Sequence, residues 1–290
     1  MARMTKAGDR TVFLNGAYVP ETEAQVSIFD RGYLMADAVY EYTAVIGGKL
    51  IDFPGHMARL QTSLEALDFG YRVDPEEFLG IHRALIARNS IDVGGVYLQI
   101  SRGVADRGFP FPNALTPTIS AFTQTINFLD HPANETGLKV ISVDDGRWAR
   151  SDIKSVQLLY TCMARTRAVN AGAQDAFFVR DGLVTEATAA NAFIVRDGRL
   201  ITRALSPDIL HGVTRRAVLD LAATQDIALE ERGFSVEEVK TADEAFVTAS
   251  PMYVLPVVQI DGEQIGSGRP GPITRTLRTL FLEHAMANAM

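Results

Sequence analysis

Apolar side chains recur at the spacing of a helix in two early stretches of the chain. The first runs from Met57 to Leu67, after Pro54 and before Gly70, and these flanking residues are typical of a helix start and stop. The second follows Asp74, a residue type that favours helix N-caps. We therefore expect two helices in this part of the chain.

Alternating apolar and polar positions predict strands in the same half of the chain. The pairs Asn15-Gly16 and Gly47-Gly48 interrupt two of these stretches and indicate hairpin turns. The strand-like stretches cover residues 12–19, 39–53, 96–101 and 118–126.

The second half mixes strand-like and helix-like stretches. Strands are expected over residues 138–143, 175–180, 191–196 and 245–249, with a last hairpin at Asp261-Gly262. Helices are expected over residues 156–170, from Val213 onward, and over residues 274–286. The buried face of the first of these helices is predicted to contain Val156, Leu159, Tyr160 and Met163, with Cys162 as a small core residue.

The chain is long enough for two domains. Its 290 residues exceed the usual size of a single hydrophobic core. Residues 130–137, D-H-P-A-N-E-T-G, are polar and include a proline, so we interpret them as a linker. The predicted organisation is a small mixed α/β domain over residues 1–129 and a larger one over residues 138–290.

Composition narrows the function classes. A net charge of -7 with scattered Lys and Arg argues against a nucleic-acid partner, because no basic stripe is present to meet phosphates. No apolar run reaches membrane length, and residues 1–10 contain no apolar targeting segment. The five histidines show no metal-ligand spacing, and Cys162 cannot form an internal disulfide. We therefore expect a cytoplasmic protein without a metal, membrane or nucleic-acid partner.

Lys154 is the main candidate for chemistry. It lies between a predicted strand, residues 138–143, and a predicted helix, residues 156–170, directly after Ile153. An amine held among apolar side chains loses hydration, which favours its neutral, nucleophilic form. Such an amine can form a Schiff base with a carbonyl compound. The alternative is a lysine at a strand end whose ammonium group reaches water.

Four other features are compatible with a bound charged ligand. Glu186 is the only ionised residue in the run V-T-E-A-T-A-A-N, where it either needs a cation or faces water from a turn. The start of a helix at Val213 and Thr214 presents free N–H groups to an anion. Arg59 lies on the first predicted helix. The loop at residues 102–112 is rich in Gly, Pro and Arg, which suits either an anion contact or solvated charge.

A single ligand accounts for the lysine, the glutamate, the arginine and the helix start. It is a phosphorylated aldehyde with a basic ring nitrogen, pyridoxal phosphate. Lys154 would hold the aldehyde, Glu186 would keep the ring nitrogen protonated, and Arg59 with the helix start at Thr214 would bind the phosphate.

Six motifs then resemble those of the class IV pyridoxal-phosphate aminotransferases. They occur in the order typical of that family and extend over nearly the whole chain. They are D-R-G-Y-L-M-A-D-A-V-Y-E (30–41), H-M-A-R-L (56–60), R-W-A-R-S-D-I-K-S (147–155), V-T-E-A-T-A-A-N-A-F (184–193), L-H-G-V-T-R (210–215) and F-V-T-A-S (246–250). Within the class, R-S-D-I-K-S-V-Q-L-L resembles the D-amino-acid transaminases more than the branched-chain L-amino-acid ones.

The resemblance implies fold type IV, with two α/β domains joined by a short loop, and a homodimer whose active sites share residues. It implies that Lys154 is the Schiff-base lysine and the proton shuttle, that Glu186 is the partner of the pyridine nitrogen, and that Leu210 packs against the ring. The residues that it implies for the phosphate are Arg59, Val213, Thr214, Ala249 and Ser250.

The implied substrate contacts are less complete. D-amino-acid members of the family hold the substrate carboxylate with a tyrosine, matching Tyr40, and an Arg-x-His loop. Here the loop reads Arg107-Gly108-Phe109 and is shorter, so an aromatic ring stands where the histidine is expected. Loss of one charge-assisted bond of roughly 1.5 to 3 kcal/mol weakens carboxylate binding about ten- to a hundredfold.

The expected reaction is a ping-pong transamination from a D-amino acid to 2-oxoglutarate or pyruvate. One alternative is an (R)-selective amine transaminase, in which Phe109 lines an apolar pocket. A second is a lyase resembling aminodeoxychorismate lyase. A third is a binding module without a cofactor.

Overall fold

A computed structural model describes residues 10–290 of the chain, and the described residues form two compact units. The first contains residues 10–127, 153–157 and 288–290, and the second contains residues 128–152 and 158–287. The predicted linker, residues 130–137, groups with the second unit and includes the short helix α4, Ala133–Thr136. The segment around Lys154 groups with the first unit. The expected lack of a targeting segment concerns residues 1–9, which are outside the described range.

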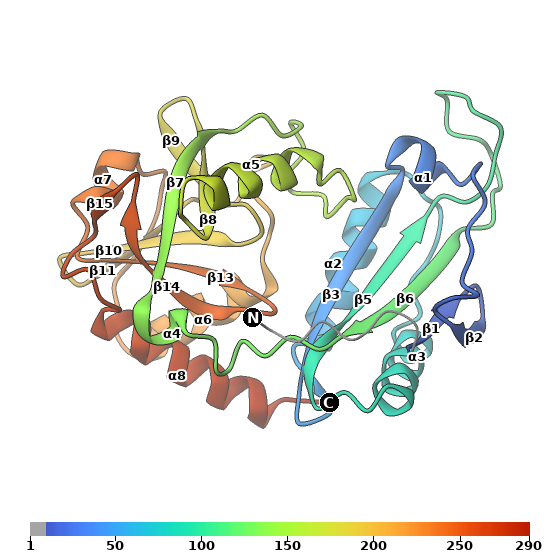
Figure 1. The fold of residues 1–290 in the computed structure, drawn as a ribbon, viewed down its shortest axis with the longest axis horizontal. Coiled ribbons are helices and arrows are strands. Elements are labelled where there is room, and N and C mark those ends of the chain that lie inside the picture. Colours follow the sequence, from blue (N-terminus) through green and yellow to red (C-terminus); the bar gives the residue numbers. More distant parts are fainter. Residues whose placement is uncertain (1–9) are drawn as a thin grey trace. The chain divides into compact units, whose positions relative to one another are not determined.

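An antiparallel sheet forms the centre of the first unit (Figure 1). Within residues 10–290 its six strands follow the order β2-β1-β6-β5-β3-β4. The two predicted hairpins are confirmed, with turns at Asn15-Gly16 and Gly47-Gly48. The strands are β1 (Thr11–Leu14), β2 (Ala17–Pro20), β3 (Ala38–Ile46), β4 (Lys49–Leu50), β5 (Val93–Ser101) and β6 (Thr118–Gln124).

Both predicted helices of the first unit are confirmed, and they pack on this sheet. Helix α2 (Phe53–Ala66) contacts β3, and helix α3 (Pro75–Arg88) contacts β1, β5 and β6. Asp74 caps α3 by accepting the backbone N–H groups of Glu76 and Glu77. A short helix that the apolar pattern does not predict, α1 (Arg31–Met35), precedes β3.

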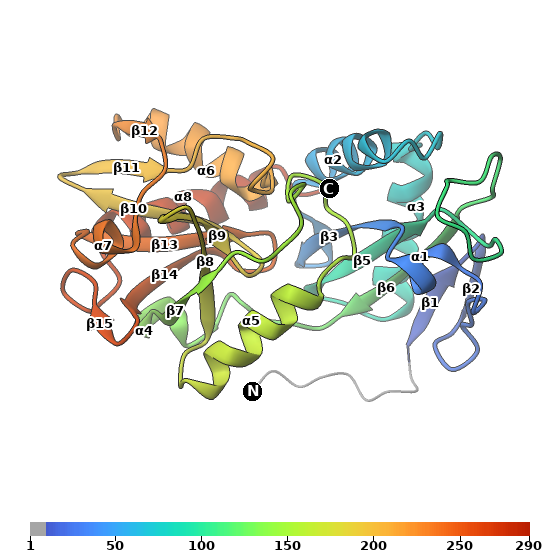
Figure 2. The same ribbon diagram turned by 90° about the horizontal axis from the view of Figure 1, so that it is seen from above.

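A larger mixed sheet forms the centre of the second unit (Figure 2). Within residues 10–290 it has nine strands in the order β12-β11-β10-β13-β14-β7-β8-β9, with β15 paired to β14. The strands are β7 (Leu138–Asp144), β8 (Asp175–Arg180), β9 (Leu183–Ala187), β10 (Asn191–Arg196), β11 (Arg199–Thr202), β12 (Leu229–Glu231), β13 (Glu244–Ala249), β14 (Tyr253–Ile260) and β15 (Glu263–Gln264).

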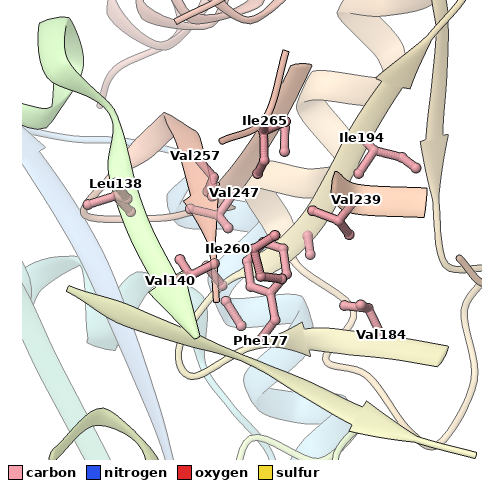
Figure 3. Packing of buried hydrophobic residues seen from close by; sticks show 14 of the residues in the cluster. Leu138, Val140, Phe177, Val184, Ile194, Val239, Val247, Val257, Ile260 and Ile265 are labelled. Carbon is pink, nitrogen blue, oxygen red and sulfur yellow. The ribbon is translucent and has the colours of Figure 1, made fainter. Parts of the chain in front are cut away.

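The sheet of the second unit is buried on both faces. Helices α6 (Val213–Thr224) and α8 (Pro272–Ala287) pack against each other and against β13. Alternate residues of the same strands enter an aliphatic core with Phe177 and with Val239 of α7 (Val236–Lys240), as Figure 3 shows. This double cover explains why the central strands are apolar at consecutive positions rather than at alternate ones.

Helix α5 (Leu159–Asn170) corrects one prediction. The side chains of Leu159 and Met163, predicted to be buried, are 76% and 45% exposed, and Cys162 is also exposed. The helix instead packs on β7 and β8 through Ala164 and Ala168, which are small enough to allow close approach. Periodicity correctly identified an apolar stripe, but not the side of the helix that the sheet covers.

Glu186 lies on a strand, β9, that the sequence analysis did not predict. Its side chain is only 6% exposed, so the alternative of a turn glutamate facing water was wrong. Among residues 10–290, no helix combines the length and the apolar character required to cross a bilayer.

Glu244, at the start of β13, generates a prediction about this fold. Its buried carboxylate accepts the backbone N–H groups of Ile273 and Thr274 at 2.9 and 2.8 Å, which fixes the first turn of α8. We expect Glu244→Ala to lower the free energy of unfolding by about 2 kcal/mol, measured by urea denaturation. Glu283→Ala, on the exposed side of α8, is the control and should change it by less than about 0.5 kcal/mol. Equal effects of the two substitutions would contradict this account of the α8 cap.

Candidate active site

The segment that carries Lys154 runs along the edge of β3 in the first unit. The carbonyl of Lys154 accepts the N–H of Tyr40 at 3.0 Å, and the N–H of Val156 donates to Ala38 at 3.1 Å. An isolated bridge joins Val39 to Ser155 between these two bonds. Helix α5 begins at Leu159 rather than at Val156, so Lys154 is held by strand-like pairing and not by the start of a helix.

The half-buried amine of Lys154 faces Tyr40. Its Nζ donates to the Tyr40 hydroxyl at 3.4 Å and lies 4.4 Å from the centre of the tyrosine ring. Tyr40 stacks on Tyr97 at 5.3 Å, and Tyr97 stacks on Phe122 at 4.8 Å. Burial, assisted by Tyr40, raises the pKa of Tyr97, so this phenol stays protonated. The aromatic row fixes the ring of Tyr40 and therefore the position of its hydroxyl group next to the amine.

Arg59, on α2, is held by a fully buried carboxylate. Its Nε and Nη2 donate to the two oxygens of Glu41 at 2.8 and 2.7 Å. The Nδ1 of His56 lies 2.7 Å from the same carboxylate. Burial alone would raise the pKa of Glu41, but the charges and hydrogen bonds of Arg59 and His56 hold it well below its ordinary value. Glu41 therefore stays ionised and fixes the plane of the Arg59 guanidinium group.

The loop that carries Arg107 and Phe109 is exposed at Phe109 and anchored at Gly108. Phe109 is 80% exposed, and the Arg107 guanidinium group lies 5.3 Å from the centre of its ring. Between them, the carbonyl of Gly108 accepts Nη1 of the buried Arg31 at 2.8 Å. Arg31 also donates to Asp37 at 2.7 Å, so a buried ion pair orients the arginine that holds this loop.

In the second unit, Glu186 receives three donors. Arg147 donates to Oε1 through Nη1, while Asn191 Nδ2 and the N–H of Leu210 each donate to Oε2 at 3.1 Å. The amide of Asn191 also donates to the carbonyl of Leu210 at 2.8 Å. Glu186 and the loop at Leu210 are therefore tied together, and the donors favour the ionised carboxylate.

The start of α6 lies next to this cluster. Gly212, the N-cap residue, has no side chain to satisfy the first N–H groups of Val213 and Thr214, and a Cβ at Gly212 would come within 2.1 Å of Asn191 Oδ1. Opposite Asn191 in the sheet, Thr248 is buried, and its hydroxyl has no hydrogen-bond partner among the described residues. Ala249 and Ser250 follow it at the end of β13.

These residues fit the pyridoxal phosphate that the sequence predicts. Asn191 connects an ionised carboxylate, suited to a protonated ring nitrogen, with a helix start suited to a phosphate. The unpaired hydroxyl of Thr248 on the same face of the sheet is a further donor without a partner in the described part of the protein.

The predicted residues fall into two sets. The first unit contains Tyr40, Arg59, Arg107, Phe109 and Lys154, and among these Lys154 contacts Tyr40 and Arg107 contacts Phe109. In the second unit, Glu186 binds Leu210, and the remaining predicted residues are Val213, Thr214, Ala249 and Ser250.

Sequence reasoning missed several residues that hold these two sets. Glu41, Asn191 and Arg147 lie inside the quoted motifs V-Y-E, A-A-N and R-W-A-R, but none was assigned a role. Their positions within motifs were the available signal. Their partners, however, are between 5 and 39 residues away in sequence and become visible only in the folded chain.

Comparison with known proteins agrees with this geometry. The family model for amino-transferase class IV matches residues 38–260. A D-alanine aminotransferase from Staphylococcus haemolyticus is 40% identical over 275 residues, covering 93% of this chain and 96% of that protein. One from Bacillus licheniformis is 37% identical over 268 residues, covering 92% and 94%.

Solved structures share the fold. A branched-chain amino acid aminotransferase from Escherichia coli superposes with a TM-score of 0.90 at 24% identity, covering 96% of this chain and 95% of that one. Another, from Thermobaculum terrenum in its PLP-form, has a TM-score of 0.83 at 23% identity and covers 97% and 95%. Since the family model spans most of the chain and relatives 36–40% identical cover nearly all of it, the chain belongs to the class IV aminotransferases, which are pyridoxal-phosphate-dependent enzymes of fold type IV.

Proposed function

We propose that this aminotransferase moves the amino group of a D-amino acid to a 2-oxo acid, 2-oxoglutarate or pyruvate, by a ping-pong mechanism. The observation that carries the proposal is the amine of Lys154, held at the Tyr40 hydroxyl on the edge of β3. The D-amino acid is supported by relatives named D-alanine aminotransferase that match over nearly the full chain.

Both sets of residues would serve one molecule of pyridoxal phosphate. Glu186 would hold the proton on its ring nitrogen, and Leu210 would pack against the ring. The phosphate would be bound by Arg59, by the start of α6 at Val213 and Thr214, and by Ala249 and Ser250. When bound, the cofactor supplies an electron-withdrawing ring and stores the amino group between the two half-reactions.

Lys154 would move the proton. Its Nζ would take a proton from the Cα of the amino donor in the first half-reaction and would return a proton to the Cα of the new amino acid in the second. Tyr40, whose hydroxyl already accepts from Nζ at 3.4 Å, would orient the amine and contact the substrate. The stack on Tyr97 keeps that hydroxyl in place during the transfer.

The substrate carboxylate would bind Arg107. The fixed carbonyl of Gly108 limits the movement of this arginine, and Phe109 next to it offers an apolar surface. The exposed ring of Phe109 is the observation that favours the second candidate, an (R)-selective amine transaminase. An amine without a carboxylate would pack on this ring and would form no ion pair with Arg107. A lyase resembling aminodeoxychorismate lyase is the third candidate.

A homodimer is supported by exposed apolar side chains of the first unit. Segments 26–34 and 104–111 are adjacent, since the N–H of Ala105 donates to the carbonyl of Phe29 at 3.2 Å and Asp30 bridges to Val104. Their exposed side chains are Val26, Ile28, Phe29, Tyr33, Leu34, Val104, Phe109 and Phe111. A patch of this kind marks a protein interface, and a second copy would cover it.

The single cysteine supports a reduced, cytoplasmic setting.

A donor panel tests the substrate. We expect turnover of D-alanine to exceed that of (R)-1-phenylethylamine and of aminodeoxychorismate. In Arg107→Ala, KM for D-alanine should rise about ten- to a hundredfold because a charged hydrogen bond is lost, while KM for the amine stays unchanged. Arg72→Ala, an exposed arginine of the same unit, is the control. Equal changes for acid and amine would show that Arg107 does not bind the carboxylate.

Substitution of Glu41 tests whether the buried ion pair between Glu41 and Arg59 stabilises the fold. Because its pKa is lowered in the folded protein, ionised Glu41 stabilises the fold above its ordinary pKa of 4.5, and this contribution is lost as pH falls below that value. Glu41→Gln should lower the free energy of unfolding by about 3 to 5 kcal/mol near neutral pH, and the difference from wild type should shrink in acid. Urea denaturation of the apoprotein across pH measures this, with Glu65→Gln on α2 as the exposed control. A difference that is constant from neutral to acid pH would contradict the assignment.

A further inference from the structure

The carboxylate of Glu186 is connected to a second carboxylate through one arginine. Arg147 donates from Nη1 to Glu186 Oε1. Its Nε and Nη2 donate to the two oxygens of Asp145 at 2.9 and 2.8 Å. One guanidinium group therefore bridges two acids, with two of its bonds on Asp145 and one on Glu186.

The remaining surfaces of Arg147 are also fixed. Nη2 donates to the carbonyl of Asp208 at 3.2 Å, and the guanidinium group lies over the ring of Phe178, 4.5 Å from its centre. Burial alone would lower the pKa of Arg147, but the hydrogen bonds and negative charges of Asp145 and Glu186 raise it above its ordinary value. The side chain is therefore a permanently charged and rigid support, unlike a surface arginine.

The side chain of Asp145 is held in place as firmly as that of Arg147. Its side chain is fully buried, it accepts the hydroxyl of Thr185 at 2.8 Å, and Arg180 lies 3.4 Å away. Burial alone would raise the pKa of Asp145, but the bonds to Arg147 and Thr185 and the charge of Arg147 lower it. Asp145 is therefore an anion.

We propose that Arg147 is a positioning residue that keeps the carboxylate of Glu186 aimed at the cofactor ring nitrogen, and that Asp145 prevents Arg147 from neutralising it. The inference rests on the proposed role of Glu186. An arginine paired with Glu186 alone would cancel its charge and weaken its attraction for a protonated nitrogen. Sharing the guanidinium group with Asp145 leaves the three groups with a net negative charge, so orientation and charge are both retained.

Other charged groups face the same cluster. Arg180 on β8 also pairs with Asp208, and Arg203 pairs with Asp208 from the segment after β11. Two arginines against one aspartate leave a net positive charge among these three groups, and Arg180 also lies 3.4 Å from Asp145. These residues are the same in all the variants proposed below. A change in the pH at which the ring nitrogen loses its proton therefore reports on Arg147 and Asp145.

The test compares Arg147→Met, Arg147→Lys and Asp145→Asn with a matched control, Arg150→Met. Arg150 is in the same motif but forms its ion pair with Asp152 at the surface, where it is 47% exposed. Two quantities are measured on each purified variant: the dissociation constant of pyridoxal phosphate by equilibrium dialysis, and the pH at which the isotope-labelled ring nitrogen loses its proton by NMR. Thermal unfolding of each apoprotein shows whether it folds.

We expect both Arg147 variants to bind pyridoxal phosphate about ten- to a hundredfold more weakly, because neither side chain can form the paired hydrogen bonds of the guanidinium group to Asp145 together with its bond to Glu186. In Asp145→Asn, the pH of ring deprotonation should fall, because the whole charge of Arg147 then acts on Glu186. In Arg147→Met it should not fall. Arg150→Met should match wild type in both measurements. Arg147→Lys serves as the test if Arg147→Met does not fold.

Two results would overturn the inference. One is wild-type affinity for pyridoxal phosphate in both Arg147 variants, and the other is a fall in the pH of deprotonation in Arg147→Met that equals the one in Asp145→Asn. Glu186→Gln separates this from failure of the proposed function. If Glu186→Gln keeps wild-type affinity and wild-type titration of the ring nitrogen, then the role of Glu186 itself is wrong.

Discussion

A buried carboxylate needs a cation or several hydrogen-bond donors, and both units of this enzyme are organised by that constraint. The cost of removing a lone carboxylate from water is several kcal/mol, and arginines offset it at Glu41 and Glu186. Arg59 and Arg147 do so. In each unit the pairing also orients a group of the candidate site. Glu41 fixes the plane of the Arg59 guanidinium group, and Arg147 with Asn191 fixes the carboxylate of Glu186.

Most of the fold could be predicted from the sequence because local signals and tertiary packing agree. Strands β8 and β10 match their predicted bounds, since each is a short apolar run ended by an Asp-Gly turn. Helix α5 shows where such reasoning ends. Its stripe containing Leu159 and Met163 was assigned to the core, but the sheet took the opposite side, where alanines allow close contact. Periodicity gives the direction of an apolar face, and only the folded unit shows what covers it.

The candidate site likewise contains residues that the sequence could predict and residues that it could not. Lys154 and Glu186 could be singled out because an amine among apolar residues and an acid among alanines are chemically unusual. Their supports could not, because these depend on residues distant in sequence. The pairing of Lys154 with β3 joins residues separated by 114 positions, and Arg147 reaches Glu186 across 39. Strand pairing and ion pairing are tertiary events, so a motif can contain such a residue without revealing its partner.

The amine of Lys154 is the group on which the proposed binding of pyridoxal phosphate depends. Reducing the holoenzyme with borohydride and mapping the modified peptide by mass spectrometry tests this directly. We predict a single phosphopyridoxyl group, attached to Lys154, and no incorporation in Lys154→Ala. Attachment to Lys139, or to any other lysine of the wild-type enzyme, would contradict the account.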